Sequence, residues 1–356
     1  MRLLVSLALF ALAPALASAE TFVYVSVAGD KRIAVYQMDA DGKLTHKGDA
    51  KTDGEPGALV ASPDRRFLFV GMRSTGDLSA FRMDAASGLL KHINTVAAGP
   101  DPAQISTDAE GRFLLCAYYV AGKVSVHTIA KDGSLGKAPW QSLATADKAH
   151  AITLDPSGRF AFVPHTGTNT IYQFRFDAKT GLLQPNAKAA RLDTPPRTGP
   201  RHMVFHPKLR TIAYVDNEQG GSVTAYALDD KTGTLKPLQT MPTVPADFKG
   251  ENACAEIRIH PTGRFLYVAN RGHDSIARFT VDEAGKLTAA GQTPTEKTPR
   301  SFDLDPDGRY LFAAGESSGK LASYRIDAKS GDLEPFGSMD VGPRAWWVLA
   351  VRTGER

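Results

Sequence analysis

The chain alternates between short apolar runs and polar turns, and this pattern recurs along its length. Residues 67–70, 160–163 and 265–268 are continuously apolar, and each run begins directly after a Pro-x-x-Arg turn. A strand that is apolar on both sides is covered on both faces of its sheet. Residues 171–176 instead alternate apolar and polar positions, as a strand farther from the core does. The pattern therefore predicts repeated pairs of a buried strand and a half-buried strand.

A second turn, of the form Asp…Gly-x-Leu, gives the repeat its period. Successive glycines of this turn are 45 to 52 residues apart. A period of this length, built only from strands and turns, is typical of a β-propeller with four strands per blade. We therefore predict an all-β fold, a seven-bladed β-propeller with four-stranded antiparallel blades. The seven glycines are Gly42, Gly88, Gly133, Gly181, Gly233, Gly285 and Gly331.

The numbers of the two turns predict how the ring closes. The second turn occurs seven times, but the first occurs six times, near residues 64, 110, 157, 208, 262 and 307. The repeat that lacks the first turn must contain both chain ends. We predict that residues 345–351 form its inner strand and pair with residues 21–27, which leaves no open edge. Residues 20–356 then form a single domain.

Residues 1–19 have the features of a secretory signal peptide. Arg2 provides a positive start, residues 3–16 are an apolar core, and Ala17-Ser18-Ala19 fits the small-x-small cleavage pattern. The apolar core is too short for a membrane span. We expect cleavage before Glu20, a periplasmic or secreted protein, and no membrane span in the mature chain.

Charge and metal-binding residue types narrow the functional classes. The formal net charge of +4 is small for 356 residues, and the basic residues are scattered, so a nucleic-acid partner is not expected. Cys116 and Cys254 fall in repeats far apart on a ring, which predicts free thiols. His202 and His206 are four positions apart on a strand, about 13 Å, too far for one metal ion. We expect no metal, no cofactor and a monomer.

Strand direction gathers charged and ring side chains at one rim. The first two strands of a blade are antiparallel and joined by a tight turn, so the start of the first and the end of the second meet at the same rim. Turn residues dominate the opposite rim and need no further explanation. The starts of first strands place His150, Arg201, His202, Glu256, Arg300 and Arg344 at this rim. The ends of second strands add Arg73, Tyr118, Tyr119, His165, Asn217, Glu218, Asn270, Arg271 and Glu316.

Three segments resemble the seven-bladed lactonase family, which includes propeller-type 6-phosphogluconolactonases and the fungal carboxymuconate lactonizing enzyme. They are residues 199–207, 266–276 and 292–300, and the resemblance extends from about residue 21 to residue 351. It implies that water opens a small-molecule sugar δ-lactone at the channel mouth. It also implies that a His, two Arg and a Glu line that mouth. Matched by motif, these are His150, Arg201, Arg271 and Glu218.

Lactone hydrolysis needs an activated water and a group that stabilises the developing oxyanion. Glu218 or His150 is expected to be the base, and Arg201 and Arg271 to be the donors. No Gly-x-Ser-x-Gly motif is present, so an acyl-enzyme is not expected. The remaining rim residues expected to contact the substrate are His202, His165, Asn217, Glu256, Arg300, Arg344 and Tyr118.

Two other functions use the same mouth. An exported propeller could bind a ligand or peptide without catalysis, and a muconate-type cycloisomerase would share the family resemblance. The export signal also bears on the substrate, because sugar phosphates are cytoplasmic. An unphosphorylated aldonolactone fits an exported enzyme better than a 6-phosphogluconolactone does.

Overall fold

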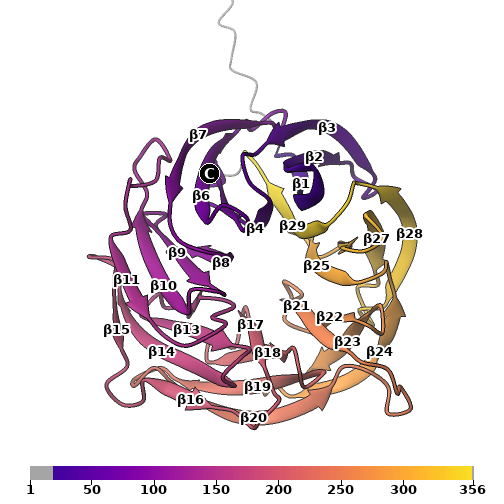
Figure 1. The fold of residues 1–356 in the computed structure, drawn as a ribbon. Helices are drawn as coiled ribbons and strands as arrows, with labels where there is room; N and C mark the ends of the chain where they lie inside the picture. Colours follow the sequence, from indigo (N-terminus) through magenta and orange to yellow (C-terminus); the bar gives the residue numbers. More distant parts are fainter. Residues whose placement is uncertain (1–18, 355–356) are drawn as a thin grey trace, which may run out of the picture.

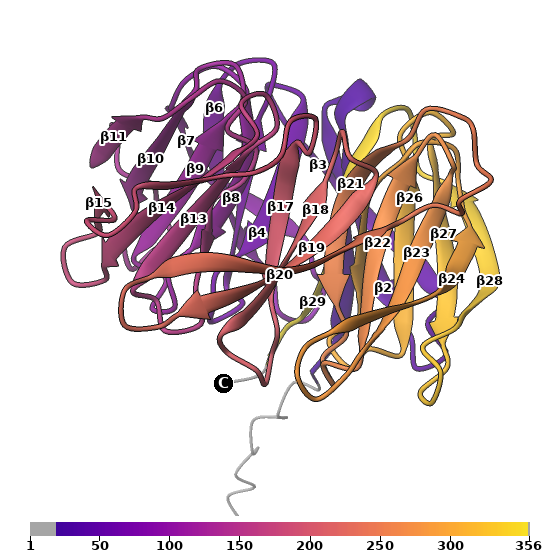
Figure 2. The same cartoon turned by 90° about the horizontal axis from the view of Figure 1, so that it is seen from below.

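A computed structural model describes residues 19–354, which form 29 β-strands and one short 3₁₀ helix, η1 (Ala28–Asp30). The predicted signal peptide lies outside the described residues apart from Ala19. Seven antiparallel sheets surround a central axis, and each is one blade (Figure 1). Seen from the side, the blades form a disc (Figure 2). No helix of the described part is long and apolar enough to cross a membrane. The predicted all-β, seven-bladed fold is confirmed.

Each blade has four strand positions between the axis and the outside. The innermost strands are β29 (Ala345–Arg352), β4 (Pro56–Ala61), β8 (Pro102–Thr107), β12 (Thr153–Leu154), β17 (Pro200–Phe205), β21 (Ala253–Ile259) and β25 (Pro299–Leu304). The second strands are β1 (Thr21–Val27), β5 (Phe67–Met72), β9 (Phe113–Tyr118), β13 (Phe160–His165), β18 (Ile212–Asn217), β22 (Phe265–Arg271) and β26 (Tyr310–Gly315).

The two outer positions complete the blades. The third strands are β2 (Arg32–Met38), β6 (Asp77–Met83), β10 (Lys123–Thr128), β14 (Thr170–Asp177), β19 (Ser222–Asp229), β23 (Ser275–Val281) and β27 (Lys320–Ile326). The outermost strands are β3 (Leu44–Lys51), β7 (Leu90–Ala97), β11 (Gln141–Ala144), β15 (Leu182–Pro185), β20 (Thr234–Pro242), β24 (Leu287–Pro294) and β28 (Leu333–Asp340). The outer edge of the fourth blade is divided, because β16 (Arg191–Asp193) also pairs with β14.

The two ends of the chain close the ring as predicted. β29 and β1 are antiparallel neighbours from Thr21 opposite Arg352 to Val27 opposite Ala345, with a shift in register between Ser26 and Val27 that leaves Trp346 unpaired with a β1 residue. The backbone N–H of Ala28 extends the contact by donating to the carbonyl of Arg344. The C-terminal strand therefore occupies the axial position of the blade that the N-terminal strand begins (Figure 1).

Six of the seven Asp…Gly-x-Leu glycines fit against an aromatic ring at the start of a second strand in the neighbouring blade, and Gly285 lies against Ile212 instead. At Gly133, φ is +89°, and an added Cβ would lie 2.2 Å from the ring of Phe67. At Gly233, φ is +75°, and an added Cβ would lie 2.1 Å from the ring of Phe160. A side chain at either position would have both a strained backbone and a clash. The glycine recurs in the repeat because each blade packs on the next at this position.

The turns of the opposite rim are structural, as expected. Asp155 accepts hydrogen bonds from the backbone N–H groups of Arg159 and Phe160, at 2.9 and 2.8 Å. The Arg159 guanidinium lies 5.2 Å from the ring of Phe160 and donates to the carbonyl of Asp230 in the next blade. This turn thus connects its own blade to the next one.

Removing the closing strand should open the ring. Deletion of residues 343–356 uncovers β1 and removes the buried side chains of Trp347, Val348 and Val351. At about 1.5–3 kcal/mol for each large apolar group, the loss is on the order of 5 kcal/mol. We expect a fall in the melting temperature by calorimetry. A truncated protein that melts within about two degrees of the full-length chain would contradict the role of this strand.

Candidate functional site

Strand register brings the expected residues to one mouth of the central channel. Pro200 lies opposite Asn217 and Pro299 lies opposite Gly315, so innermost strands start where second strands end. This confirms the antiparallel argument. We define the rim cluster as Arg73, His150, Arg201, Glu218, Arg271, Arg300, Glu316 and Trp346, which belong to six blades.

The centre of the rim cluster is one carboxylate held by two guanidinium groups. Glu218 Oε2 lies 3.0 Å from Arg201 Nε and 3.1 Å from Arg271 Nη2. Arg201 and Glu218 belong to the fifth blade and Arg271 to the sixth. The Arg201 side chain is 2% exposed, whereas Glu218 keeps 22% of its side-chain surface. Solvent therefore reaches the carboxylate and Arg271, which is 16% exposed, but not Arg201.

The neighbouring charges shift the pKa values of Glu218 and Arg271. Burial alone would raise the pKa of Glu218, but the fields of Arg201, Arg271 and Arg300 lower it below its ordinary value. Burial and the neighbouring Arg201 lower the pKa of Arg271. Arg271 Nη2 also donates to the carbonyl of Cys254, while its buried Nε has no partner among the described residues. Glu218 is thus ionised at neutral pH beside an unused N–H donor.

His150 lies against the same group and is neutral. Its ring makes edge contacts with Tyr119 and His202, at centroid distances of 5.6 and 5.0 Å. Burial, and then the nearby Arg201, lowers its pKa well below 6.5. Its buried Nδ1 has no hydrogen-bond partner within residues 19–354. A neutral imidazole with an unused ring nitrogen is available to act on a bound molecule.

Trp346 organises a second group of arginines. The guanidinium carbons of Arg73, Arg300 and Arg344 lie 5.7, 5.4 and 5.3 Å from its ring centroid. Each arginine also has a carboxylate partner, namely Asp101, Glu316 and Glu55 respectively. Trp346 Nε1 donates to Glu316 at 2.9 Å. Arg300 therefore lies at this mouth, as expected, and Arg344 lies farther out, with 45% of its side chain exposed.

His202 and Glu256 are buried beside Arg201 and bond to each other. Their side chains are 5% and 0% exposed, and His202 Nδ1 lies 3.1 Å from Glu256 Oε1. Burial would raise the pKa of Glu256, but Arg258 and His202 lower it to about 2. Since Glu256 is ionised, it accepts the Nδ1–H bond, which leaves His202 Nε2, 3.4 Å from Arg201 Nη1, as an acceptor. The expected substrate contacts are instead supports for Arg201.

Three other expected residues bond to partners in their own or a neighbouring blade. Tyr118 Oη bonds to Ser125, His165 Nε2 bonds to Thr145, and Asn217 Nδ2 bonds to Ser222 and Thr224. Each is the last residue of a second strand, and successive strand residues face opposite sides. The next residues, Tyr119 and Glu218, therefore reach the mouth. The strand rule named both members of these two pairs, and alternation separates them.

The sequence analysis missed Trp346 and the carboxylate partners Asp101 and Glu55. Trp346 is at the start of an innermost strand, so the strand rule itself could have found it. No pattern in the sequence distinguishes Asp101 or Glu55 from ordinary turn residues. Both cysteines are buried and free. Within the described residues, no group of three or more His, Cys, Asp or Glu is arranged to hold a metal ion.

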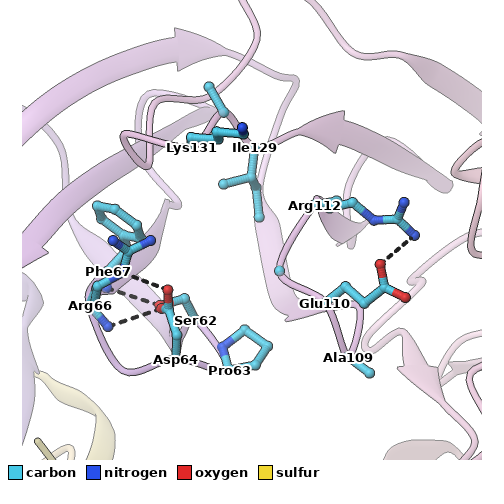
Figure 3. Close-up of a pocket in the computed structure, with 12 residues that line it drawn as sticks. Ser62, Pro63, Asp64, Arg66, Phe67, Ala109, Glu110, Arg112, Ile129 and Lys131 are labelled. Carbon is cyan, nitrogen blue, oxygen red and sulfur yellow. Dashed lines mark hydrogen bonds and ion pairs between the residues drawn. The ribbon is translucent and has the colours of Figure 1, made fainter. Parts of the chain in front are cut away.

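A pocket on the opposite rim lacks the buried charged groups of the rim cluster. It has a volume of about 470 Å³ and lies between turns of two neighbouring blades (Figure 3). Its charged groups pair within their own turns, Arg66 with Asp64 and Arg112 with Glu110. All four side chains are more than 40% exposed, so water screens these pairs. The buried charges of the rim cluster mark the better candidate site.

One buried acid beneath the site predicts a pH effect on stability. Asp216 Oδ1 accepts the backbone N–H of His202 at 2.7 Å, and burial raises the pKa of Asp216 to about 7. Between about pH 4 and pH 7, the folded state holds this proton and the unfolded state does not. The free energy of unfolding therefore falls as pH rises, by about 1.4 kcal/mol per pH unit for one proton. Asp216→Asn cannot ionise and lacks this contribution.

Urea unfolding at pH 4.5 and pH 7 measures this contribution. The stability of Asp216→Asn relative to the parent should increase between the two pH values. Asp193→Asn, on the exposed strand β16, is the control and should follow the parent. Equal pH dependence in the parent and Asp216→Asn would show that Asp216 is not held protonated.

Comparisons with known proteins agree with this arrangement. The model of the family described as lactonase, seven-bladed β-propeller, matches residues 13–102 and 59–350. A 6-phosphogluconolactonase of Pectobacterium carotovorum is 36% identical over 330 residues, covering 92% of this chain and 98% of the relative. One from Cronobacter sakazakii is 36% identical over 328 residues, covering 92% of this chain and 97% of the relative.

Solved structures give the same result. The periplasmic gluconolactonase of Pseudomonas aeruginosa has a TM-score of 0.86 and 28% identity, covering 94% of this chain and 99% of that chain. A putative 6-phosphogluconolactonase of Bacteroides fragilis has a TM-score of 0.86 and 25% identity, covering 95% and 100%. Together with the family match over most of its length, these similarities show that the chain belongs to the seven-bladed β-propeller lactonase family.

Proposed function

We propose that this protein hydrolyses a sugar δ-lactone at the rim cluster. The observation that carries the proposal is the single carboxylate of Glu218, shared by Arg201 and Arg271 beside the neutral His150. This group contains an ionised acid, an unpartnered imidazole nitrogen and an unpartnered guanidinium N–H. Membership of the lactonase family and relatives named 6-phosphogluconolactonase support the same chemistry.

The arginines would act on the charge that develops at the lactone carbonyl. Attack by water converts the carbonyl oxygen into an oxyanion, and ring opening then yields a carboxylate. Arg271 Nε–H has no partner among the described residues, so it is available to donate to either species. A guanidinium held in place by Glu218 also needs little rearrangement during the reaction. A guanidinium group can donate two parallel hydrogen bonds to one carboxylate, which suits the product.

The proton of the attacking water requires a base that is unprotonated at neutral pH. Both candidates meet this requirement, because the pKa of Glu218 is below its ordinary value and that of His150 is well below 6.5. The proton then passes to the ring oxygen that leaves as a hydroxyl group. Cys254 is an improbable nucleophile, because burial raises the pKa of its thiol to about 12.

The substrate is proposed from two further features. Relatives of this chain are named 6-phosphogluconolactonase, and a structural neighbour is a periplasmic gluconolactonase. The predicted signal peptide would separate this protein from cytoplasmic sugar phosphates. A lactone formed by oxidation of a sugar outside the cytoplasm, such as an unphosphorylated aldonolactone, would fit export.

Substitutions in the rim cluster test the proposal. Glu218→Gln keeps the shape but removes the charge, so kcat should fall roughly 10²–10⁴-fold. Arg201→Lys and Arg271→Lys keep the charge but lose the fork, so kcat/KM should fall as well. Titration of released acid at constant pH, with the spontaneous rate subtracted, measures turnover of aldonolactones and their 6-phosphates.

Arg159→Lys, in a turn of the opposite rim, is the matched control and should keep the turnover of the parent. Variants of Glu218, Arg201 and Arg271 that retain the parent's kcat/KM would place the active site elsewhere. Ligand binding by a folded parent that hydrolyses none of these lactones would instead favour a non-catalytic binding propeller.

Export is tested separately. Cleavage at Ala17-Ser18-Ala19 predicts that the mature protein begins at Glu20 and is found outside the cytoplasm. Mass spectrometry of the protein from its native cell, after fractionation, identifies the N-terminus and the compartment. Soluble native protein with an intact N-terminal segment would contradict export and would favour a cytoplasmic, phosphorylated substrate.

A further inference from the structure

A small cavity beside Glu218 is lined by cations and indole rings. It has a volume of about 10 Å³, which is room for about one water-sized atom. No aspartate or glutamate lines it, and the cationic side chains around it come from three blades. The lining residues are Gly57, Ala58, Arg73, Ala103, His150, Arg201, Arg300, Trp346 and Trp347.

Two lining residues carry buried polar atoms without a partner. Trp347 Nε1 and His150 Nδ1 bond to nothing within residues 19–354, although the two residues are 8% and 4% exposed. Buried polar groups in folded proteins are almost always hydrogen-bonded. Indole and guanidinium groups can only donate. The missing partner of Trp347 Nε1 is therefore an acceptor, and next to Arg73 and Arg300 it is best a negatively charged oxygen.

The arginines around this cavity repel one another. The three arginines that line it have Asp101, Glu218 and Glu316 as partners, and Glu218 is also used by Arg271. Burial, and then repulsion from Arg201, lowers the pKa of Arg300 to about 10. An added anion would relieve this repulsion.

The guanidinium groups also keep donors for a ligand. Arg73 uses Nε and Nη2 for Asp101, and Arg300 uses Nη1 for Glu316. The other N–H groups of both arginines make no side-chain bond within the described part of the chain. Their side chains are 16% and 17% exposed, so a molecule in the mouth can reach them.

We propose that Arg73, Arg300 and Trp347 form a second oxyanion subsite, which receives a negatively charged substituent of the lactone. One oxygen of the substituent enters the cavity, and the rest of the group lies in the mouth. Arg201 lines the cavity and also holds Glu218, so it connects this subsite to the proposed reaction centre. The shared chemistry is an oxyanion, either a phosphate ester or a carboxylate. This inference rests on the proposed lactonase function.

Binding of inorganic phosphate tests the subsite without catalysis. Calorimetric titration of the parent should show saturable binding, and Arg73→Gln and Arg300→Gln should weaken it roughly tenfold to a hundredfold, the effect of losing a charged hydrogen bond. Trp347→Phe removes the N–H donor together with part of the ring but keeps an aromatic group in the core, so it should weaken phosphate binding in a protein that a cooperative melting curve shows to be folded. Arg159→Gln, on the opposite rim, should bind like the parent. Absence of saturable binding, or equal binding by all variants, would overturn the subsite.

Lactone preference identifies the substituent and separates this inference from the proposed function. Gluconolactone, its 6-phosphate and a glucarolactone differ in whether the far end is neutral, a phosphate or a carboxylate. The subsite predicts a kcat/KM at least tenfold higher for one of the two charged lactones. Equal values for all three would overturn the subsite and leave the lactonase function intact. Phosphate binding without hydrolysis of any lactone would contradict the lactonase function and leave the subsite intact.

Discussion

The pairing of β1 with β29 is the constraint on which the rest of the structure depends. This contact holds the N- and C-terminal strands in register and turns seven separate sheets into one closed ring. A closed ring fixes the innermost strands around a single axis. Because each blade repeats the same antiparallel hairpin, every blade then delivers its variable residues to the same mouth. The glycine and aromatic contacts between blades preserve the geometry of the ring, as Gly133 does against Phe67.

The mouth contains more buried cationic charge than a stable core needs. Removing charges from water is costly unless they are paired, and here each arginine has a carboxylate partner from a neighbouring strand or blade. His202 and Glu256 support Arg201 from below, where water does not reach. Glu218 is the exception, since it serves two arginines. The least satisfied part of this network therefore lies where a substrate can enter, as expected for a site prepared for an anionic reaction centre.

The repeat and the antiparallel rule predicted the fold, the closure and the rim from the sequence, because these follow from spacing alone. The sequence did not predict how deeply each rim side chain is buried or which way it points. A shift of one position separates Asn217, which bonds within its blade, from Glu218, which reaches the mouth. His202 adjoins Arg201 in the chain but lies beneath it. Trp346 belongs to a closing strand whose apolar sequence indicated only core packing, and its role depends on arginines from three blades.

A crystal structure of the protein with an aldonate product tests the central claim most directly. The account predicts that the product lies in the mouth, with its carboxylate within about 3 Å of the guanidinium nitrogens of Arg201 and Arg271. It also predicts that His150 Nδ1 acquires a partner. An aldonate bound reproducibly elsewhere, such as between the turns of the opposite rim, with the Glu218 group unchanged and empty, would contradict the account.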